Sequence, residues 1–278
     1  MLRQLAKKTL EFYATRLPYH RGKWRVIESA LRLSGIEALD RGQTFEIARA
    51  GLHWRLNTEC VVQRRLCYHG GFDVYDVREL MSRVPAHGVF FDIGSYFGYY
   101  SLLAAQRGAR VFAFEPDPAN FSLLSQHIAL NAFDQIHAIP LALSDAPGRA
   151  RFASASMENR GTGHLAGKDE AGHDITLTTL DAFVVEQGIE RLDALKLDVE
   201  GAETRVLAGG RESLRRFRPV MLVELNPPCL ERAGSSEPEL LGALSDLGYR
   251  PMLATARGLV PFTRRSKDYV NLICLPDR

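Results

Sequence analysis

Carboxylates and glycines stand in this chain where runs of apolar residues end, a placement typical of a ligand site at the edge of a sheet. One short apolar run ends at Asp92, and a turn with two glycines four residues apart, Gly94 and Gly98, follows it. The next apolar run, Val111–Phe114, ends at Glu115. This pattern predicts a strand–helix–strand unit that carries a nucleoside at the carboxyl ends of its strands.

The turn after Asp92 favours a cationic ligand over a dinucleotide. Its pattern is D-x-G-x-x-x-G rather than G-x-G-x-x-G, so it lacks the glycines that let the backbone approach a pyrophosphate closely. An acid at this point repels phosphate but attracts an ammonium or a sulfonium. We therefore infer S-adenosylmethionine (SAM) as the ligand, with Asp92 accepting from its ammonium, directly or through water, and Glu115 from its ribose hydroxyls. The backbone of Gly94, Ser95 and Gly98 would pass beneath it.

Asp145 and Asp117 can each be explained by local structure, and Asp145 also by contact with the ligand. Ser144 and Asp145 follow an apolar run that ends at Leu143. Asp145 would accept from the adenine amino group while Ser144 fixes the loop, but Ser-Asp-Ala-Pro-Gly also forms a turn by itself, and both interpretations stay open. Asp117, which precedes Pro118, is interpreted as a helix N-cap.

Three acids near the ends of two later apolar runs predict the chemical centre. Asp198 and Glu200 follow the run that ends at Leu197, and Glu224 ends the next one. Clustered carboxylates are costly without a cation, which the ligand, Lys196 or a metal could supply. We expect Asp198, Glu200 and Glu224 to be catalytic, with Glu224 or Asp198 taking a hydroxyl proton. Glu224 could instead be a structural acid, and the three acids could instead hold Mg²⁺.

The composition narrows the class of protein. The 278 residues include 35 basic and 33 acidic side chains, a balance that gives no electrostatic footprint for nucleic acid. The four cysteines form no CxxC, which indicates free thiols in a cytoplasmic protein. No apolar run is long enough for a transmembrane span. Residues 1–17 have helical spacing, which predicts a helix packed on the body or on a second subunit, with peripheral membrane binding as the weaker alternative.

The alternation of strand and helix patterns predicts an α/β fold with a doubly wound, mostly parallel sheet. The last apolar run, 269–275, would be an edge or antiparallel strand, and residues 154–174 would be a substrate loop. Residues 1–70 are expected to be an extension of helices and a strand pair at 44–62, before a domain at 71–278. Strands are expected at 89–92, 110–115, 136–142, 149–153, 175–178, 193–198, 219–225 and 248–254, and helices at 74–84, 98–107, 117–131, 179–186, 202–208, 210–216 and 237–246.

From about Phe72 onward the chain resembles the FkbM family of SAM-dependent methyltransferases. The segments that carry the resemblance, in the family's order, are FDIGSYFGYYSLLAA, FAFEPDPANFSLLSQHIALN, ALSD, LTTLD, LKLDVEGAE and VELNP. The resemblance implies a Rossmann-like methyltransferase acting on a hydroxyl of a sugar, a lipid-linked glycan or a natural product. The positions that match the family's cofactor residues are Asp92, Gly94, Glu115, Asn120 and Asp145, and those that match its acidic motif are Asp198 and Glu200.

The chain departs from the family's pattern at two places. Ser95-Tyr96 stands where the family usually has Ala-Asn, and Asn226 stands where it often has a histidine. Residues and resemblance together predict O-methylation by in-line transfer. The alternatives are Mg²⁺-assisted transfer and a non-catalytic SAM-binding scaffold; an NAD(P)-dependent oxidoreductase would need the glycine pattern that this chain lacks.

Overall fold

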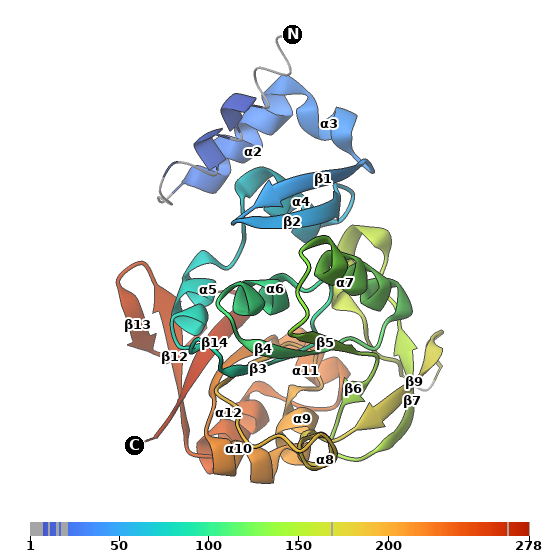
Figure 1. Cartoon of the computed structure of the whole chain (residues 1–278), viewed down its shortest axis with the longest axis vertical. Coiled ribbons are helices and arrows are strands. Elements are labelled where there is room, and N and C mark those ends of the chain that lie inside the picture. Colours follow the sequence, from blue (N-terminus) through green and yellow to red (C-terminus); the bar gives the residue numbers. More distant parts are fainter. Residues whose placement is uncertain are drawn as a thin grey trace. The chain divides into compact units, whose positions relative to one another are not determined.

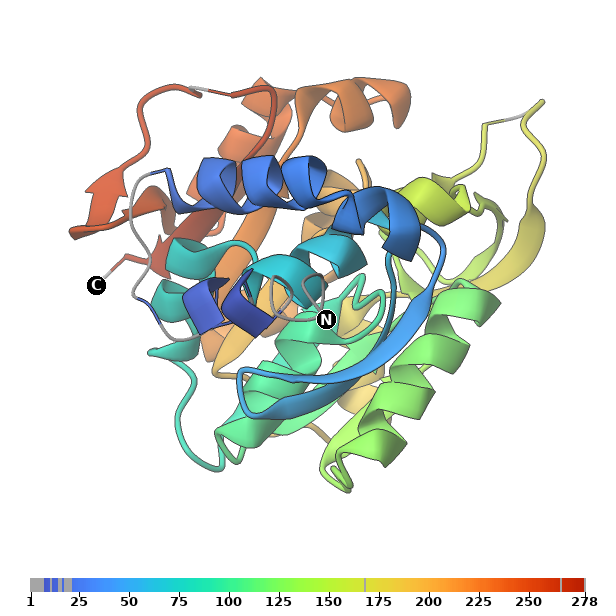
Figure 2. The same cartoon turned by 90° about the horizontal axis from the view of Figure 1, so that it is seen from above.

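The computed structural model describes residues 8–10, 12–14, 17, 22–167, 169–265 and 267–277. Its chain divides into two compact units. One contains the described residues up to Val74 together with Ser156–Gly161, and the other contains Tyr75–Ala155 and the described residues from Thr162 onward. Figures 1 and 2 trace the elements of both units.

The N-terminal unit contains a strand pair among helices. Strands β1 and β2 are antiparallel and meet at Ala50 and Gly51, both with positive φ, as a tight hairpin requires. The predicted strand pair is confirmed, but its expected end at Val62 is wrong, because a helix begins at Val61. The helix expected over 1–17 lies largely outside the described residues. The elements are α2 (Lys23–Ser34), α3 (Ile36–Asp40), β1 (Thr44–Arg49), β2 (Leu52–Asn57) and α4 (Val61–His69).

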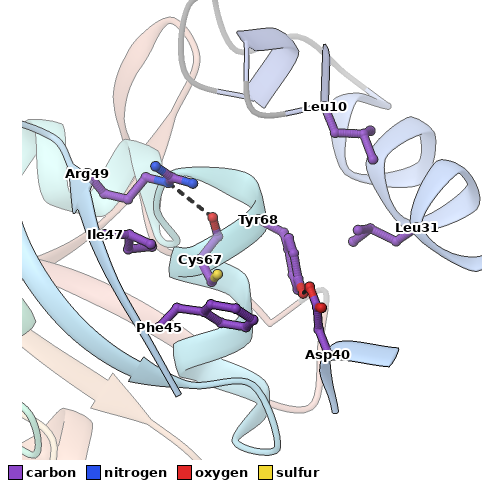
Figure 3. Close-up of a pocket in the computed structure, with 8 residues that line it drawn as sticks. All are labelled: Leu10, Leu31, Asp40, Phe45, Ile47, Arg49, Cys67 and Tyr68. Carbon is purple, nitrogen blue, oxygen red and sulfur yellow. Dashed lines mark hydrogen bonds between the residues drawn. The ribbon is translucent and has the colours of Figure 1, made fainter. Parts of the chain in front are cut away.

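This unit also contains a partly open, mostly apolar pocket of about 190 Å³. The Tyr68 hydroxyl donates to Asp40 at 2.5 Å, and Arg49 Nε donates to the Cys67 carbonyl at 3.0 Å, so polar groups of the wall bond to other wall residues (Figure 3). The lining residues are Leu10, Leu31, Asp40, Phe45, Ile47, Arg49, Cys67 and Tyr68.

The second unit is built on an eight-stranded sheet in the order β13-β12-β14-β11-β10-β3-β4-β5. The five strands from β11 to β5 are parallel, which confirms the predicted doubly wound, mostly parallel sheet. Its strands are β3 (Val89–Ile93), β4 (Arg110–Phe114), β5 (Ile136–Ile139), β10 (Ala194–Leu197), β11 (Val220–Leu225), β12 (Tyr249–Thr255), β13 (Gly258–Pro261) and β14 (Val270–Pro276).

The C-terminal strand is antiparallel, as predicted, but it is not an edge strand. β14 lies between β11 and β12 and runs antiparallel to both. Its residues Leu272, Ile273 and Cys274 are fully buried, and such a run fits an interior strand, which has no face in water. The edge strand on this side of the sheet is β13, which the sequence analysis did not predict.

Helices cover both faces of this sheet (Figure 1). α5, α6 and α7 lie on one face, and α8, α9, α10 and α12 on the other. The helices are α5 (Val74–Met81), α6 (Tyr99–Gln106), α7 (Pro118–Leu130), α8 (Leu180–Glu186), α9 (Glu203–Gly209), α10 (Arg211–Phe217), α11 (Pro227–Arg232) and α12 (Glu237–Asp246). The layered arrangement is Rossmann-like.

Prolines mark two boundaries in this unit. Pro227, shortly after β11, begins α11, because proline fits the first turn of a helix. We expected one strand over 136–142, but β5 ends at Ile139, before Pro140. A second, four-stranded sheet follows in the order β6-β9-β7-β8. Its strands are β6 (Ala142–Leu143), β7 (Gly148–Ala153), β8 (His164–Leu165) and β9 (His173–Thr178), with the 3₁₀ helix η1 (Met157–Thr162) before β8.

An aromatic cluster holds α8 against the main sheet. Phe91, Phe112 and Phe114 each lie within 5.8 Å of the Phe183 ring on α8, in edge-to-face geometry. Such pairs contribute about 0.5–1.5 kcal/mol each beyond their buried area. The strands whose carboxyl ends carry the predicted site are therefore fixed from one face.

Candidate functional site

The turn between β3 and α6 requires both of its glycines. Gly94 has φ +79°, and a Cβ there would lie 1.9 Å from the carbonyl oxygen of Asp198, at the end of the neighbouring β10. Gly98 has φ +87°, and its Cβ would lie 2.5 Å from Leu124 Cδ1 on α7. Ser95 turns inward, donating from its N–H and its hydroxyl to the Phe114 carbonyl at 2.9 and 3.2 Å. The turn is thus pressed between β4, β10 and α7.

Glu115 is a fixed carboxylate at the end of β4. Its Oε2 accepts from the Tyr96 N–H at 2.7 Å and its Oε1 from the Asp117 N–H at 2.9 Å. Burial raises the pKa of Glu115 to about 7, although both hydrogen bonds oppose that shift. Each oxygen keeps a lone pair, so this carboxylate can accept from two vicinal hydroxyls.

Asp117 is the N-cap of α7, as the sequence predicted. Its carboxylate accepts from the N–H groups of Ala119 and Asn120 at 2.9 and 3.0 Å. It also accepts from the Ser154 hydroxyl. Asn120 is buried in the first turn of that helix. Glu115 is therefore the acid of this segment that remains for a ligand.

Asp92 is fully buried beneath the turn. Its Oδ2 accepts from the Ser101 hydroxyl at 2.6 Å, a partner that the sequence analysis missed. Its Oδ1 has no hydrogen-bond partner, and Lys196 Nζ lies 3.9 Å away. Burial raises the pKa of Asp92 against the opposing charge of Lys196. Because Asp92 has no exposed surface, any effect of its charge on a ligand would pass through Ser101, Lys196 and the turn.

Lys196 links the turn to the acids. Its ammonium donates to the Gly94 carbonyl at 2.6 Å and lies 3.2 Å from Asp198 Oδ2. Burial by itself lowers the pKa of Lys196, but the charges of Asp198 and Asp92 outweigh it and raise the pKa. The sequence analysis named the ligand, Lys196 or a metal as the cation that could balance the acids. The structure shows that Lys196 contacts Asp198 and lies near Asp92.

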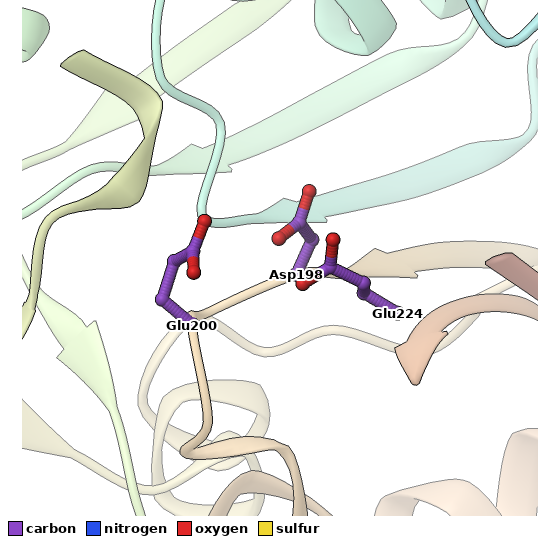
Figure 4. Close-up of side chains that lie close together, drawn as sticks. All are labelled: Asp198, Glu200 and Glu224. Atoms are coloured by element: carbon purple, nitrogen blue, oxygen red, sulfur yellow. The ribbon is translucent and has the colours of Figure 1, made fainter. Parts of the chain in front are cut away.

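The three predicted catalytic acids lie together. Asp198, Glu200 and Glu224 each offer an oxygen, and these oxygens lie within 4.8 Å of one another (Figure 4). Asp198 is partly exposed, whereas Glu224 is buried. Burial, followed by the charge of Asp198, raises the pKa of Glu200 to about 7 and that of Glu224 well above its usual range. The expected meeting of these acids at one sheet edge is confirmed; their catalytic role stays a prediction.

Side chains of α11 and of Asn226, the residue before it, contact this cluster. Cys229 donates its thiol to Glu200 Oε2 at 3.1 Å, and Asn226 donates to Glu224 Oε2 at 3.4 Å. Burial and the bond to Glu200 raise the pKa of Cys229 to about 12, so the thiol stays a protonated donor. Glu203 is a structural acid, since it accepts from the N–H groups of Val199 and Gly201 at 2.9 and 3.3 Å.

Ser144 and Asp145 follow β6. The Ser144 N–H donates to the Thr178 carbonyl at 2.9 Å, and its hydroxyl donates to Asp145 Oδ1 at 2.9 Å. Ser144 is buried and Asp145 is exposed. Ser144 thus fixes the loop as predicted, while a contact of Asp145 with adenine stays a prediction.

The strand register places the candidate residues in one row. Ile93 is level with Phe114 on one side and with Leu197 on the other, and Leu197 is level with Val223. The residues that follow these positions therefore lie side by side at the carboxyl ends of the parallel strands. The chain runs from β3 to β4 and β5, then returns to β10 and β11 on the other side of β3. Ligands of open α/β sheets bind where the strand order reverses in this way.

The groups at this edge fit a ligand that is both cationic and hydroxylated. Because Gly94 has no Cβ, the turn can lie directly against the Asp198 carbonyl, which brings it next to the acid cluster. Glu115 presents a fixed acceptor, and the partly exposed Asp198 presents carboxylate oxygens next to Glu200 and Glu224. The ammonium, sulfonium and ribose of SAM match this set of donors and acceptors.

Comparison with known proteins agrees with this geometry. The Methyltransferase FkbM domain matches residues 92–251, more than half of the chain. The chain belongs to the FkbM methyltransferase family. The resemblance seen in the sequence is thereby confirmed, and the FkbM match includes Asp92, Glu115 and the three clustered acids.

Three curated relatives are methyltransferases by name. Methyltransferase sdnD of Sordaria araneosa is 27% identical over 209 residues, 63% of this chain and 77% of that one. Hexuronic acid methyltransferase AglP of Haloferax volcanii is 27% identical over 146 residues, 52% and 59% of the two chains. 2-O-methyltransferase NoeI of Sinorhizobium fredii is 29% identical over 148 residues, 47% and 60%. The match thus spans about three fifths of AglP and NoeI. Within the described residues we find no helix with the length and apolar character of a membrane span.

Proposed function

We propose that this chain is a SAM-dependent O-methyltransferase whose acceptor is a hydroxyl of a sugar, a glycan or lipid, or a natural product. The observation that carries the proposal is the acid cluster of Asp198, Glu200 and Glu224 next to the Gly94 turn. The names of AglP and NoeI, a hexuronic acid methyltransferase and a 2-O-methyltransferase, support a sugar hydroxyl. The transferase domain would be residues 71–278.

The cofactor would lie along the row of strand ends. SAM supplies the methyl group, already activated on sulfur. Glu115 would accept from the ribose hydroxyls, and the buried Asp92 would act on the ammonium end through Lys196 and the turn. Gly94, Ser95 and Gly98 would shape the backbone beneath the ligand. The remaining predicted contacts are Asn120, Ser144 and Asp145.

The acids would handle the acceptor hydroxyl. A bond forms between the hydroxyl oxygen and the methyl carbon as the carbon–sulfur bond breaks, and the hydroxyl proton passes to a carboxylate. Asp198 suits that role, because it is partly exposed and Lys196 holds it at 3.2 Å. Glu200 and Glu224 would orient the hydroxyl. Alignment of the reacting atoms and exclusion of water would supply most of the rate.

Mg²⁺-assisted transfer is a second candidate because the three acid oxygens lie within 4.8 Å. A metal there would lower the pKa of the acceptor hydroxyl. Lys196 already places a positive charge beside Asp198, which favours transfer without a metal.

Transfer of a labelled methyl group from SAM to a panel of hydroxylated acceptors tests the proposal. The panel contains hexuronic acids, neutral sugars, a lipid-linked glycan and a polyketide alcohol, each with EDTA and with added Mg²⁺. We expect label on oxygen with at least one acceptor class, unchanged by EDTA. Loss of transfer in EDTA and recovery with Mg²⁺ would establish the metal mechanism. Binding of S-adenosylhomocysteine without transfer to any acceptor would favour the scaffold.

A further inference from the structure

The acidic side chains of α2 and α3 are paired with neighbouring residues. Glu28 Oε1 lies 2.9 Å from His69 Nε2, and Asp40 accepts from the Tyr68 hydroxyl at 2.5 Å. Of the basic side chains of α2, Lys23 is buried and donates to the Ala14 carbonyl at 2.7 Å, whereas Arg25 and Arg32 are exposed. Glu37 pairs with an arginine of α4 at 3.8 Å and is half-buried. The carboxylates of the two helices are therefore paired with neighbouring side chains.

The exposed side chains of the same helices are basic, apolar or small. The exposed residues of α2 and α3 are Arg25, Val26, Ser29, Arg32, Leu33, Ala38 and Leu39. None of them is acidic. Arg41, which follows α3, is exposed as well and lies 3.9 Å from Glu158, a loose contact between two mostly exposed side chains. Among the described residues of α2 and α3, the exposed charged residues are thus all basic. Glu28 lies one helical turn from both Arg25 and Arg32 with its side chain 37% exposed, but it is paired with His69.

The spacing on α2 makes two parallel rows. Arg25 and Arg32 are seven residues apart, as are Val26 and Leu33, and seven residues are close to two helical turns. Leu33 is 90% exposed and Val26 49%, and Leu39 on α3 is 55% exposed. Large aliphatic side chains exposed beside arginines are typical of helices that lie in a membrane interface.

We propose that this face of α2 and α3 rests on an anionic phospholipid surface. Leu33, Val26 and Leu39 would enter the headgroup region, and Arg25 and Arg32 would donate to lipid phosphates, whose geometry suits the guanidinium fork. A second copy of the chain is the poorer occupant, because two such faces would oppose arginines, while the acids of α2 and α3 are already paired with His69, Arg64 and Tyr68. The inference is independent of methyl transfer.

Co-sedimentation of the full chain with vesicles tests this surface. Phosphatidylcholine vesicles are compared with mixed phosphatidylcholine–phosphatidylglycerol vesicles, at low and at high salt. We expect binding to the mixed vesicles that high salt reverses, and little binding to phosphatidylcholine alone. Arg25→Glu/Arg32→Glu and Leu33→Ser should each weaken binding about fivefold or more.

Matched controls keep the outcome specific. Val185→Ser changes an aliphatic residue of α8 that is 79% exposed, and Arg149→Glu/Arg215→Glu changes the net charge by the same amount elsewhere. Both should bind as the wild type does, and circular dichroism checks that every variant is folded. The proposal is overturned if the wild type does not sediment with mixed vesicles, or if the α2 variants bind like the controls. A wild-type dimer that Leu33→Ser converts to a monomer would also overturn it, with a second copy as the occupant.

Discussion

Replacing Lys196 by methionine tests how much its positive charge, which links the Gly94 turn to Asp92 and Asp198, contributes to stability. Methionine keeps most of the stem but removes the donor to Gly94 and the partner of Asp92 and Asp198. Asp92 is fully buried, and its Oδ1 already lacks a hydrogen bond, so the variant leaves an uncompensated buried carboxylate.

Removal of one partner from a buried pair costs about 3–5 kcal/mol. We expect the lower end, about 3 kcal/mol, because Asp198 is partly exposed and Asp92 can take up a proton. Without Lys196 the folded-state pKa of Asp92 rises further above its unfolded value. A raised acid pKa gives stability that is present at low pH and lost as pH rises. The loss should therefore be larger at pH 8 than at pH 5.

Urea unfolding of four proteins measures this effect: the wild type, Lys196→Met, Asp92→Asn and the double variant. The midpoint and slope give the free energy of unfolding of each. The double variant should recover about 1–3 kcal/mol relative to the sum of the single ones, since contacting residues couple. A loss under about 1 kcal/mol in Lys196→Met, or strict additivity at both pH values, would refute the role given to this ammonium.

Two further predictions concern the same edge of the sheet. The ligand-free protein should lose thermal stability between about pH 5 and pH 8, because burial raises the pKa values of Glu115, Glu200 and Glu203 to about 7, and acids with raised pKa stabilise the fold only while protonated. A melting temperature that rises over this range, or an unchanged slope in Glu200→Gln, would contradict the assignment. Gly94→Ala should abolish binding of S-adenosylhomocysteine in calorimetry, since its Cβ would meet the backbone of β10, whereas Gly188→Ala, at φ +59° with open space around it, should bind normally. Normal binding by Gly94→Ala would show that the turn does not need its glycine.

Much of the fold could be predicted because its signals are local. Apolar runs that end in acids gave the parallel strands, and the carboxyl ends of parallel strands meet at one edge, so the cluster of Asp198, Glu200 and Glu224 followed. The structural effect of each proline was harder to predict from the sequence. Pro140 separates β5 from β6, whereas Pro227 begins α11, and the same residue type supports either outcome.

The contacts within the site depended on tertiary structure. The bond from Ser101 to Asp92 joins residues of a helix and a strand, and no spacing rule in the sequence pairs them. The thiol of Cys229 looked like an unremarkable core residue until α11 placed it against Glu200. Asp92 was expected near the ligand, but its complete burial could not be inferred from a sequence that showed only an acid at a strand end.

Calorimetric titration with S-adenosylhomocysteine tests the central claim most directly, with NADH as the competing ligand and Glu186→Ala, an exposed acid of α8, as the matched control for Glu115→Ala. The account predicts that the wild type and Glu186→Ala bind S-adenosylhomocysteine and not NADH. It also predicts that Glu115→Ala binds about tenfold more weakly, or about 1.4 kcal/mol. Binding of NADH in its place, or equal affinity in Glu115→Ala and the wild type, would contradict a SAM site at the end of β4.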